Sequence, residues 1–145
     1  NIRYTVSDIE KINKDSNCKI FLIGLSDVFG NHGLVGLIII RKVSFDTCII
    51  DNMMLSCRVF GRNLESWILK KVIDMSKKDK IKYVIAEYVK TKKNKIALDF
   101  LKANNFKVLK SKIEKLNISK KRFNYQSTYL FDIIKDDVPN LELFK

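Results

Sequence analysis

A strand-like segment runs directly into a helix-like segment around residues 55–65, and this junction constrains the fold more than any other part of the chain. The run before it, Cys48–Leu55, reads as a strand. After it, apolar side chains recur at helical spacing, at Leu64, Ile68, Val72 and Met75. The residues between, 58–63, are therefore predicted to form a strand-to-helix turn.

A turn of this kind is suited to binding phosphate. The first N–H groups of a helix lack intrahelical partners, and they point to a spot that carries the positive end of the helix dipole. Gly61 would let the backbone approach a ligand closely, and Arg58 and Arg62 would add guanidinium donors. A tight turn with two solvated arginines would contain the same residues, so both interpretations stay open on the turn alone.

The spacing Arg58-x-x-Gly61-x-Asn63 resembles motif A of the GNAT acyltransferase superfamily, R/Q-x-x-G-x-G/A. In that superfamily the motif wraps the pyrophosphate of acyl-coenzyme A. The resemblance implies that Leu55 and Cys57 offer backbone groups to the pantetheine arm. It also implies that the pyrophosphate is bound at Val59, Phe60, Gly61, Arg62, Asn63 and Leu64. Asn63 replaces the usual Gly or Ala, and Asn tolerates unusual backbone angles better than most residues.

Three separated motifs narrow the resemblance. Residues 27–36 (D-V-F-G-N-H-G-L-V-G), residues 55–62 (L-S-C-R-V-F-G-R) and Glu87-Tyr88 followed by Thr91-x-x-Asn94 resemble the C-terminal GNAT-like domain of the FkbH-like family. The resemblance runs from about Arg3 to Ile133. It implies an upstream haloacid-dehalogenase-type (HAD) domain that draws on 1,3-bisphosphoglycerate to load a glyceryl unit onto an acyl carrier protein.

The predicted fold is a mixed α/β domain of the GNAT type, with about six to seven strands flanked by helices. Residues 1–138 form the domain, and residues 139–145 form a tail. The expected strands are Lys19–Ser26, Val35–Arg41, Cys48–Ser56, Lys82–Val89, Phe106–Lys110 and Tyr125–Ile134. The expected helices are Ser7–Asp15, which starts with the capping pattern Ser7-Asp8-Ile9-Glu10, Arg62–Lys78 and Thr91–Asn104. The third and fourth strands should be parallel because a full helix joins them.

A ligand of such a strand–helix–strand unit lies at the carboxyl ends of the strands. Glu87 and Tyr88 occupy that end of the fourth strand, so Glu87 could act as a base and Tyr88 could donate a proton to a leaving thiolate, and either could equally be an orienting group. Of the two, we expect Glu87 to be the first polar group that faces an acyl substrate. Cys57, next to Arg58 and a helix start, is a possible nucleophile, but a small apolar residue at a strand end is the commoner case. His32, the only histidine, is a candidate general base, but we interpret it as a residue without catalytic function in a hydrophilic turn spanning residues 27–34.

The segment Asn94-x-x-Ala97-x-x-Phe100-Leu101-x-x-x-Asn105-Phe106 resembles motif B of the same superfamily, N-x-x-A-x-x-F-Y-x-x-x-G-F. It implies that Asn94 hydrogen-bonds the pantetheine or its phosphate. Asn105 replaces the Gly that ends the helix, which is a mild change because Asn also adopts left-handed caps. Leu101 replaces the Tyr that protonates the departing thiolate in many acetyltransferases. Binding is therefore better supported than turnover, and whether the chain is an enzyme stays open.

The formal charge of +12 invites a polyanionic partner, and 18 of the 28 basic residues lie between Lys70 and Arg122. Solvated helix faces or a nucleotide bias in the genome would produce the same lysines. Three functions remain. The first is an acyltransferase or acyl-binding domain that uses acetyl-coenzyme A, coenzyme A or the phosphopantetheine of an acidic carrier protein. The second is a non-catalytic carrier-protein docking module. The third is a nucleic-acid binder, which ranks last because neither interleaved aromatics nor a known motif accompanies the charge.

The three cysteines, Cys18, Cys48 and Cys57, show no metal-type spacing, and no metal site is expected. We interpret them as reduced thiols of a cytoplasmic protein. No stretch approaches the ~18 consecutive apolar residues of a membrane span, so no membrane partner is expected.

Overall fold

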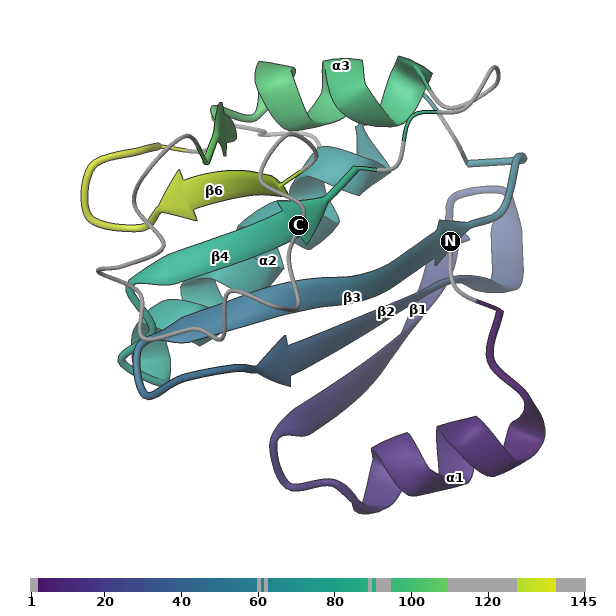
Figure 1. Cartoon of the computed structure of the whole chain (residues 1–145). Helices are drawn as coiled ribbons and strands as arrows, with labels where there is room; N and C mark the ends of the chain where they lie inside the picture. Colours follow the sequence, from purple (N-terminus) through teal and green to yellow (C-terminus); the bar gives the residue numbers. More distant parts are fainter. Residues whose placement is uncertain are drawn as a thin grey trace.

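The computed structural model describes residues 3–59, 61, 63–88, 90, 95–109 and 128–137, which form a six-stranded mixed sheet with packed helices (Figure 1). The elements are α1 (Val6–Lys14), β1 (Cys18–Asp27), β2 (Gly30–Lys42), β3 (Thr47–Leu55), α2 (Leu64–Lys78), β4 (Tyr83–Glu87), α3 (Lys95–Ala103), β5 (Lys107–Val108) and β6 (Thr128–Asp132). The strand order is β1-β2-β3-β4-β6-β5. The predicted mixed α/β class is confirmed.

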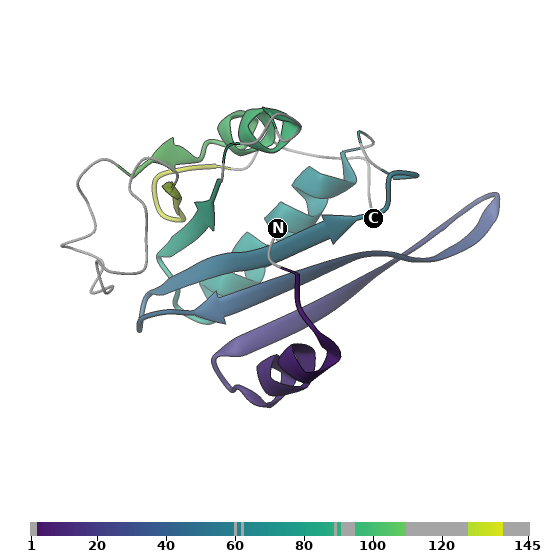
Figure 2. The ribbon, with the colours of Figure 1, turned by 45° about the vertical axis from the view of Figure 1, so that its right-hand side comes forward.

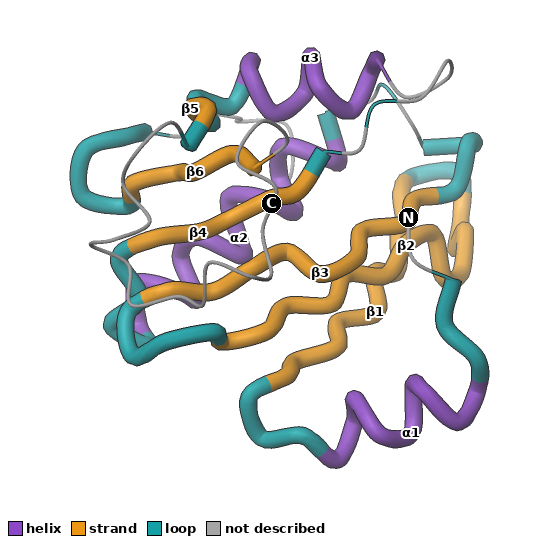
Figure 3. Tube along the Cα trace, in the orientation of Figure 1, coloured by secondary structure: helices purple, strands orange, loops and turns teal. Residues whose placement is uncertain are grey.

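The unit β3–α2–β4 is the centre of this sheet. β3 and β4 pair in parallel, whereas the other neighbouring strands pair antiparallel. The predicted parallel pair is thus confirmed, and Figure 3 shows α2 crossing behind these two strands. α2 is the longest described helix, with 15 residues. No described helix is long and apolar enough to cross a bilayer.

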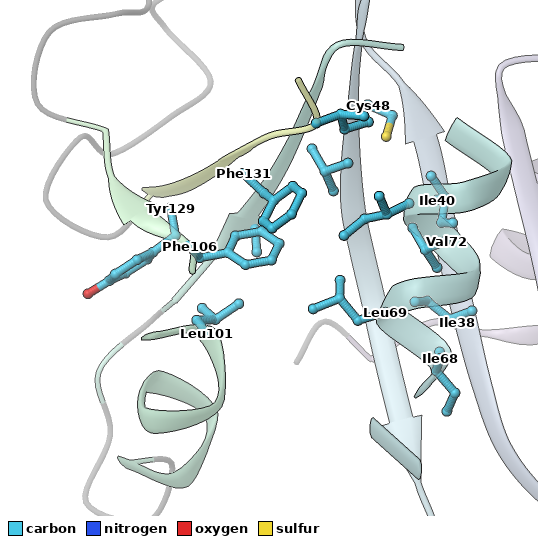
Figure 4. Close-up of a cluster of buried hydrophobic side chains, with 14 of the residues drawn as sticks. Ile38, Ile40, Cys48, Ile68, Leu69, Val72, Leu101, Phe106, Tyr129 and Phe131 are labelled. Carbon is cyan, nitrogen blue, oxygen red and sulfur yellow. The ribbon is translucent and has the colours of Figure 1, made fainter. Parts of the chain in front are cut away.

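A single buried cluster attaches α2 and α3 to the sheet (Figure 4). Its members are mostly aliphatic and aromatic side chains from both helices and from five strands, including Ile38, Ile40, Ile68, Leu69, Val72, Leu101 and Phe131. Each such side chain contributes about 1.5–3 kcal/mol when fully buried. The cluster also contains Val59 and Leu64, so the turn between β3 and α2 is anchored at both ends.

The first helix begins one residue earlier than predicted. Its N-cap is Thr5, whose hydroxyl accepts from the Asp8 N–H, while the Asp8 carboxylate accepts from the Thr5 N–H at 2.9 Å. The capping box is therefore Thr5–Asp8, and the predicted Ser7–Glu10 box is wrong. Two overlapping patterns of this kind occur two residues apart in the sequence, and local spacing alone does not choose between them.

The predicted turn at residues 27–34 is mostly strand. β1 extends to Asp27 and β2 starts at Gly30, so the hairpin is longer than expected and projects from the sheet (Figure 2). Its register shifts between Ile23 and Gly24 and again between Leu25 and Ser26. These irregularities accommodate the turn-like glycines inside a strand, since extra residues can bulge out of an antiparallel ladder. At the other end of the chain, β6 ends at Asp132 rather than at the predicted Ile134, and the predicted strand residues Lys110 and 125–127 lie outside the described residues.

Gly36 sets the spacing of β2 and β3 where β3 ends. A Cβ added there would lie 2.6 Å from Leu55 Cδ2 and 3.1 Å from the Met54 carbonyl oxygen. Gly36→Ala should therefore lower the free energy of unfolding by about 1–3 kcal/mol, measured by urea denaturation.

Gly24→Ala is the matched control, because its nearest neighbour would be the Gly33 carbonyl oxygen at 3.7 Å, an ordinary contact. Equal stability losses in the two variants would show that the close approach at Gly36 is not the cause.

Candidate functional site

The two parallel strands separate toward their carboxyl ends. The β3–β4 ladder runs from the pair Thr47–Tyr83 to the pair Ile50–Ala86 and then stops. β3 continues to Leu55, and its remaining residues pair only with β2 in the described sheet. Figure 1 shows the two strands diverging beyond this point. We call the region where residues 51–55 of β3 diverge from the carboxyl end of β4 the opening.

A β-bulge lies where the separation starts. Ile39 pairs with Asn52 and Ile40 pairs with Ile50, so Asp51 is an extra residue on β3. A bulge bends its strand and increases the local twist. Because the bulge follows directly after the last β3–β4 pair, it accounts for the departure of β3 from β4.

β3 leads directly into the turn that the sequence assigned to phosphate. The Ser56 N–H donates to the Val35 carbonyl at 2.8 Å, and the Val59 N–H donates to the Ser56 carbonyl at 3.0 Å. The Ser56 hydroxyl accepts from the Arg58 backbone N–H and from its side-chain Nε, at 3.4 and 3.3 Å. These bonds, with the buried side chain of Val59, hold the first half of the turn in place.

The second half of the turn uses two left-handed residues. Gly61 has φ +78° and Asn63, the N-cap of α2, has φ +63°, so α2 begins at Leu64 rather than at the predicted Arg62. Asn63 makes no side-chain cap bond. The Gly61 N–H donates to Glu65 Oε1 at 2.7 Å. The predicted requirement for Gly and Asn at these two positions therefore has a backbone cause.

Seven of the predicted cofactor-binding residues lie in this one continuous segment: Leu55, Cys57, Arg58, Val59, Gly61, Asn63 and Leu64. The side chains of Val59 and Leu64 are buried in the core, which leaves their backbone groups as the only ones that could meet a ligand. Cys57 and Arg58 are exposed. The remaining three, Phe60, Arg62 and Asn94, lie outside the described residues.

The two predicted catalytic residues have different surroundings. Glu87 is exposed at the carboxyl end of β4, where its backbone pairs with Thr128 of β6. Tyr88 follows it, but its ring is buried in the core, edge-to-face with Tyr129 at 6.4 Å between centroids. Both residues therefore lie at the carboxyl end of β4, Glu87 exposed and Tyr88 with its ring packed against the core.

One polar cluster at the opening was not predicted. The Tyr4 hydroxyl donates to Asp51 Oδ2, and Arg41 Nε lies 3.7 Å from Asp51 Oδ1. Burial, followed by the Asp51 carboxylate, raises the pKa of Tyr4 to about 12. Tyr4 and Asp51 are far apart in the sequence, and the only local signal was the polar pair Asp51-Asn52 within an apolar strand.

Two other predicted candidates have local explanations. His32 Nε2 lies 2.9 Å from Asp27 Oδ2 within the hairpin. The Phe29 N–H, followed by His32, holds the pKa of Asp27 below its usual value. The three cysteines are free, and burial raises the pKa of both Cys18 and Cys48 to about 11. Only Cys57 among them is exposed.

A cavity of about 290 Å³ lies at the other end of the sheet, away from this opening. Its lining includes Lys19, Cys48, Ser76 and Asp79. Cys48 Sγ and Ser76 Oγ are 3.7 Å apart, and the Lys19–Asp79 ion pair lies at the surface. The cavity shares no residue with the predicted site.

No family model matches the chain, and no curated protein matches it. Several solved structures, however, have a similar fold. Tetrahymena GCN5 is similar with a TM-score of 0.66 and 16% identity, over 86% of this chain and 74% of that one. A GNAT-family acetyltransferase from Staphylococcus aureus has a TM-score of 0.62 and 16% identity, over 88% and 75% of the two chains.

A GNAT-family acetyltransferase from Elizabethkingia anophelis, solved with acetyl-CoA bound, has a TM-score of 0.58 and 16% identity, over 87% of this chain and 80% of that one. At such identities the similarity concerns architecture. The chain has the fold of the GNAT acetyltransferases, as its motifs predicted.

The Tyr4–Asp51 contact makes stability depend on pH. Because the pKa of Tyr4 is raised in the folded state, its contribution is present below pH ~10 and is lost as the pH rises through about 12. We expect a fall of about 1 kcal/mol in the free energy of unfolding between these values, less than the full linkage value because Tyr4 is partly exposed.

Urea denaturation at pH 9 and pH 11.5 measures this fall. Tyr4→Phe should lack this component of the fall, whereas Tyr83→Phe should keep it. Identical pH profiles for wild type and Tyr4→Phe would contradict the assignment.

Proposed function

We propose that this domain binds an acyl-thioester of pantetheine in the opening between β3 and β4 and transfers the acyl group. One observation carries the proposal: the β3–β4 ladder stops at Ile50–Ala86, while β3 continues into a turn that precedes a helix. The part of β3 beyond this ladder therefore leads directly to a helix N-terminus. The GNAT fold supports the same reading.

The backbone of β3 beyond Ile50 hydrogen-bonds the two amides of the pantetheine arm, which lies beside β3 as an added strand would. The phosphate of the arm then reaches the turn, where Arg58 is exposed and the N-terminus of α2 favours anions. The arm therefore runs along β3 with its phosphate at the N-terminus of α2. Its thioester lies at the opposite end of the arm, between β3 and β4.

Glu87 is the group to which we assign the acceptor's proton, because it is exposed at the carboxyl end of β4. Tyr88 keeps its predicted role as the proton donor to the departing thiolate. Asn94 keeps its predicted role in binding the arm. In this proposal Cys57 supplies only backbone groups.

The motifs extend the proposal to a particular reaction. They support a carrier protein as the source of the phosphopantetheine arm, a glyceryl unit derived from 1,3-bisphosphoglycerate as the acyl group, and an upstream HAD-type domain that loads it. Coenzyme A or acetyl-coenzyme A offers the same pantetheine and serves as the accessible probe.

A second function is favoured by Leu101. It is 8% exposed and belongs to the core cluster, so the position that carries a thiolate-protonating Tyr in many acetyltransferases is purely apolar here. A domain that docks the carrier arm and leaves chemistry to another domain would need no such Tyr. Thiol release separates the two functions: a chain that binds acetyl-coenzyme A but releases no free thiol to added amines is a docking module.

Gly61→Glu tests the binding site. A thermal melt of the wild type with acetyl-coenzyme A at about 100 times its dissociation constant should show stabilisation of ~2.7 kcal/mol, or roughly 5–10 °C. Gly61→Glu should abolish the shift, since it places a negative side chain in the turn.

Gly33→Glu is the matched control. Gly33 has φ +68° against +78° for Gly61, and an added Cβ meets nothing within 4 Å at either position. Both substitutions introduce the same kind of backbone strain, so the two variants differ only in whether the added Glu lies in the turn before α2. If Gly33→Glu lost the shift as well, or if the wild type showed none, free coenzyme A would be excluded as the ligand.

A further inference from the structure

Glu65 is a buried carboxylate within the proposed phosphate turn. It is the second residue of α2, it is only 8% exposed, and its Oε1 accepts the Gly61 N–H at 2.7 Å. Among the described residues, no Lys, Arg or His side chain lies within ion-pair distance of it. Neither the motifs nor the spacing singled out this residue.

The position of Glu65 in the first turn of α2 suits an acidic side chain. The start of a helix favours an anion, and a hydrogen bond from a backbone N–H to a carboxylate is a strong one. Asn63 makes no side-chain cap bond, so Glu65 is the acidic group that complements this helix start. The carboxylate thereby uses the same field, and one of the same N–H donors, that a phosphate would use.

A phosphate bound at this turn would lie close to the Glu65 carboxylate. Like charges repel, and the repulsion is strong where burial excludes water, as it does around Glu65. The penalty grows with the charge of the ligand. A pyrophosphate carries two negative charges at this point of the arm, and a phosphodiester carries one.

We propose that Glu65 sets the charge selectivity of the turn and disfavours a pyrophosphate relative to a single phosphodiester. The inference rests on the proposed function and refines it, since it makes a pantetheine arm attached through one phosphodiester the preferred ligand. Glu65 acts as a specificity-determining residue and takes no part in the acyl transfer itself.

Three probes with the same pantetheine arm measure this selectivity in the full chain by calorimetric titration. Dephospho-coenzyme A carries the pyrophosphate, the methyl diester of 4′-phosphopantetheine carries one charge, and pantetheine carries none. Glu65→Gln keeps an oxygen acceptor for the Gly61 N–H and removes the charge. We expect it to tighten binding of dephospho-coenzyme A about tenfold, to tighten the diester by a smaller factor, and to leave pantetheine unchanged.

Two further variants complete the design. Asp74→Asn removes one negative charge from the same helix, away from the turn, and should leave all three affinities unchanged. Glu65→Ala removes the acceptor as well as the charge, so its difference from Glu65→Gln measures how much the carboxylate holds the turn in place.

The outcomes are distinct. Equal affinities in wild type and Glu65→Gln for all three probes overturn the inference and leave Glu65 a structural residue. An equal gain for pantetheine and dephospho-coenzyme A overturns it too, because the gain would not follow phosphate charge. Binding of no probe by either protein overturns the proposed function and the inference with it.

Discussion

The hydrogen-bond ladder between β3 and β4 is the constraint on which the candidate site depends. It holds the centre of the sheet together from Thr47–Tyr83 to Ile50–Ala86, and it ends where Asp51 bulges out of β3. Beyond this point β3 diverges from β4 and leads into the turn before α2.

Packing in the core fixes the position of the turn before α2 relative to the sheet. The buried cluster joins α2 to the sheet and takes in Val59 and Leu64 from the turn. The turn is therefore fixed to the core at both ends, although its middle is polar. A ligand that extends from the strand edge to the helix would meet two rigid elements and little adaptable surface, which lowers the entropy cost of binding.

Electrostatics at the turn balance opposing contributions. The helix start and Arg58 favour an anion, while the carboxylate of Glu65 already accepts one backbone N–H there. On the other side of the opening, Asp51 is held by Tyr4 and Arg41, which joins the segment before α1 to the middle of the sheet. Two buried or half-buried carboxylates, Asp51 and Glu65, thus lie in the bulge of β3 and in the first turn of α2.

Local pattern determined much of this protein: the strand–helix–strand unit, the parallel pair, the strand-to-helix turn and the left-handed positions Gly61 and Asn63 follow from periodicity and residue type. Those features depend on neighbours within a few residues. The Asp51 bulge, the contact with Tyr4, the burial of Tyr88 and the choice of the Thr5–Asp8 cap were decided by tertiary structure. Each depends on which strand or segment lies alongside, and that depends on how the whole apolar surface is buried.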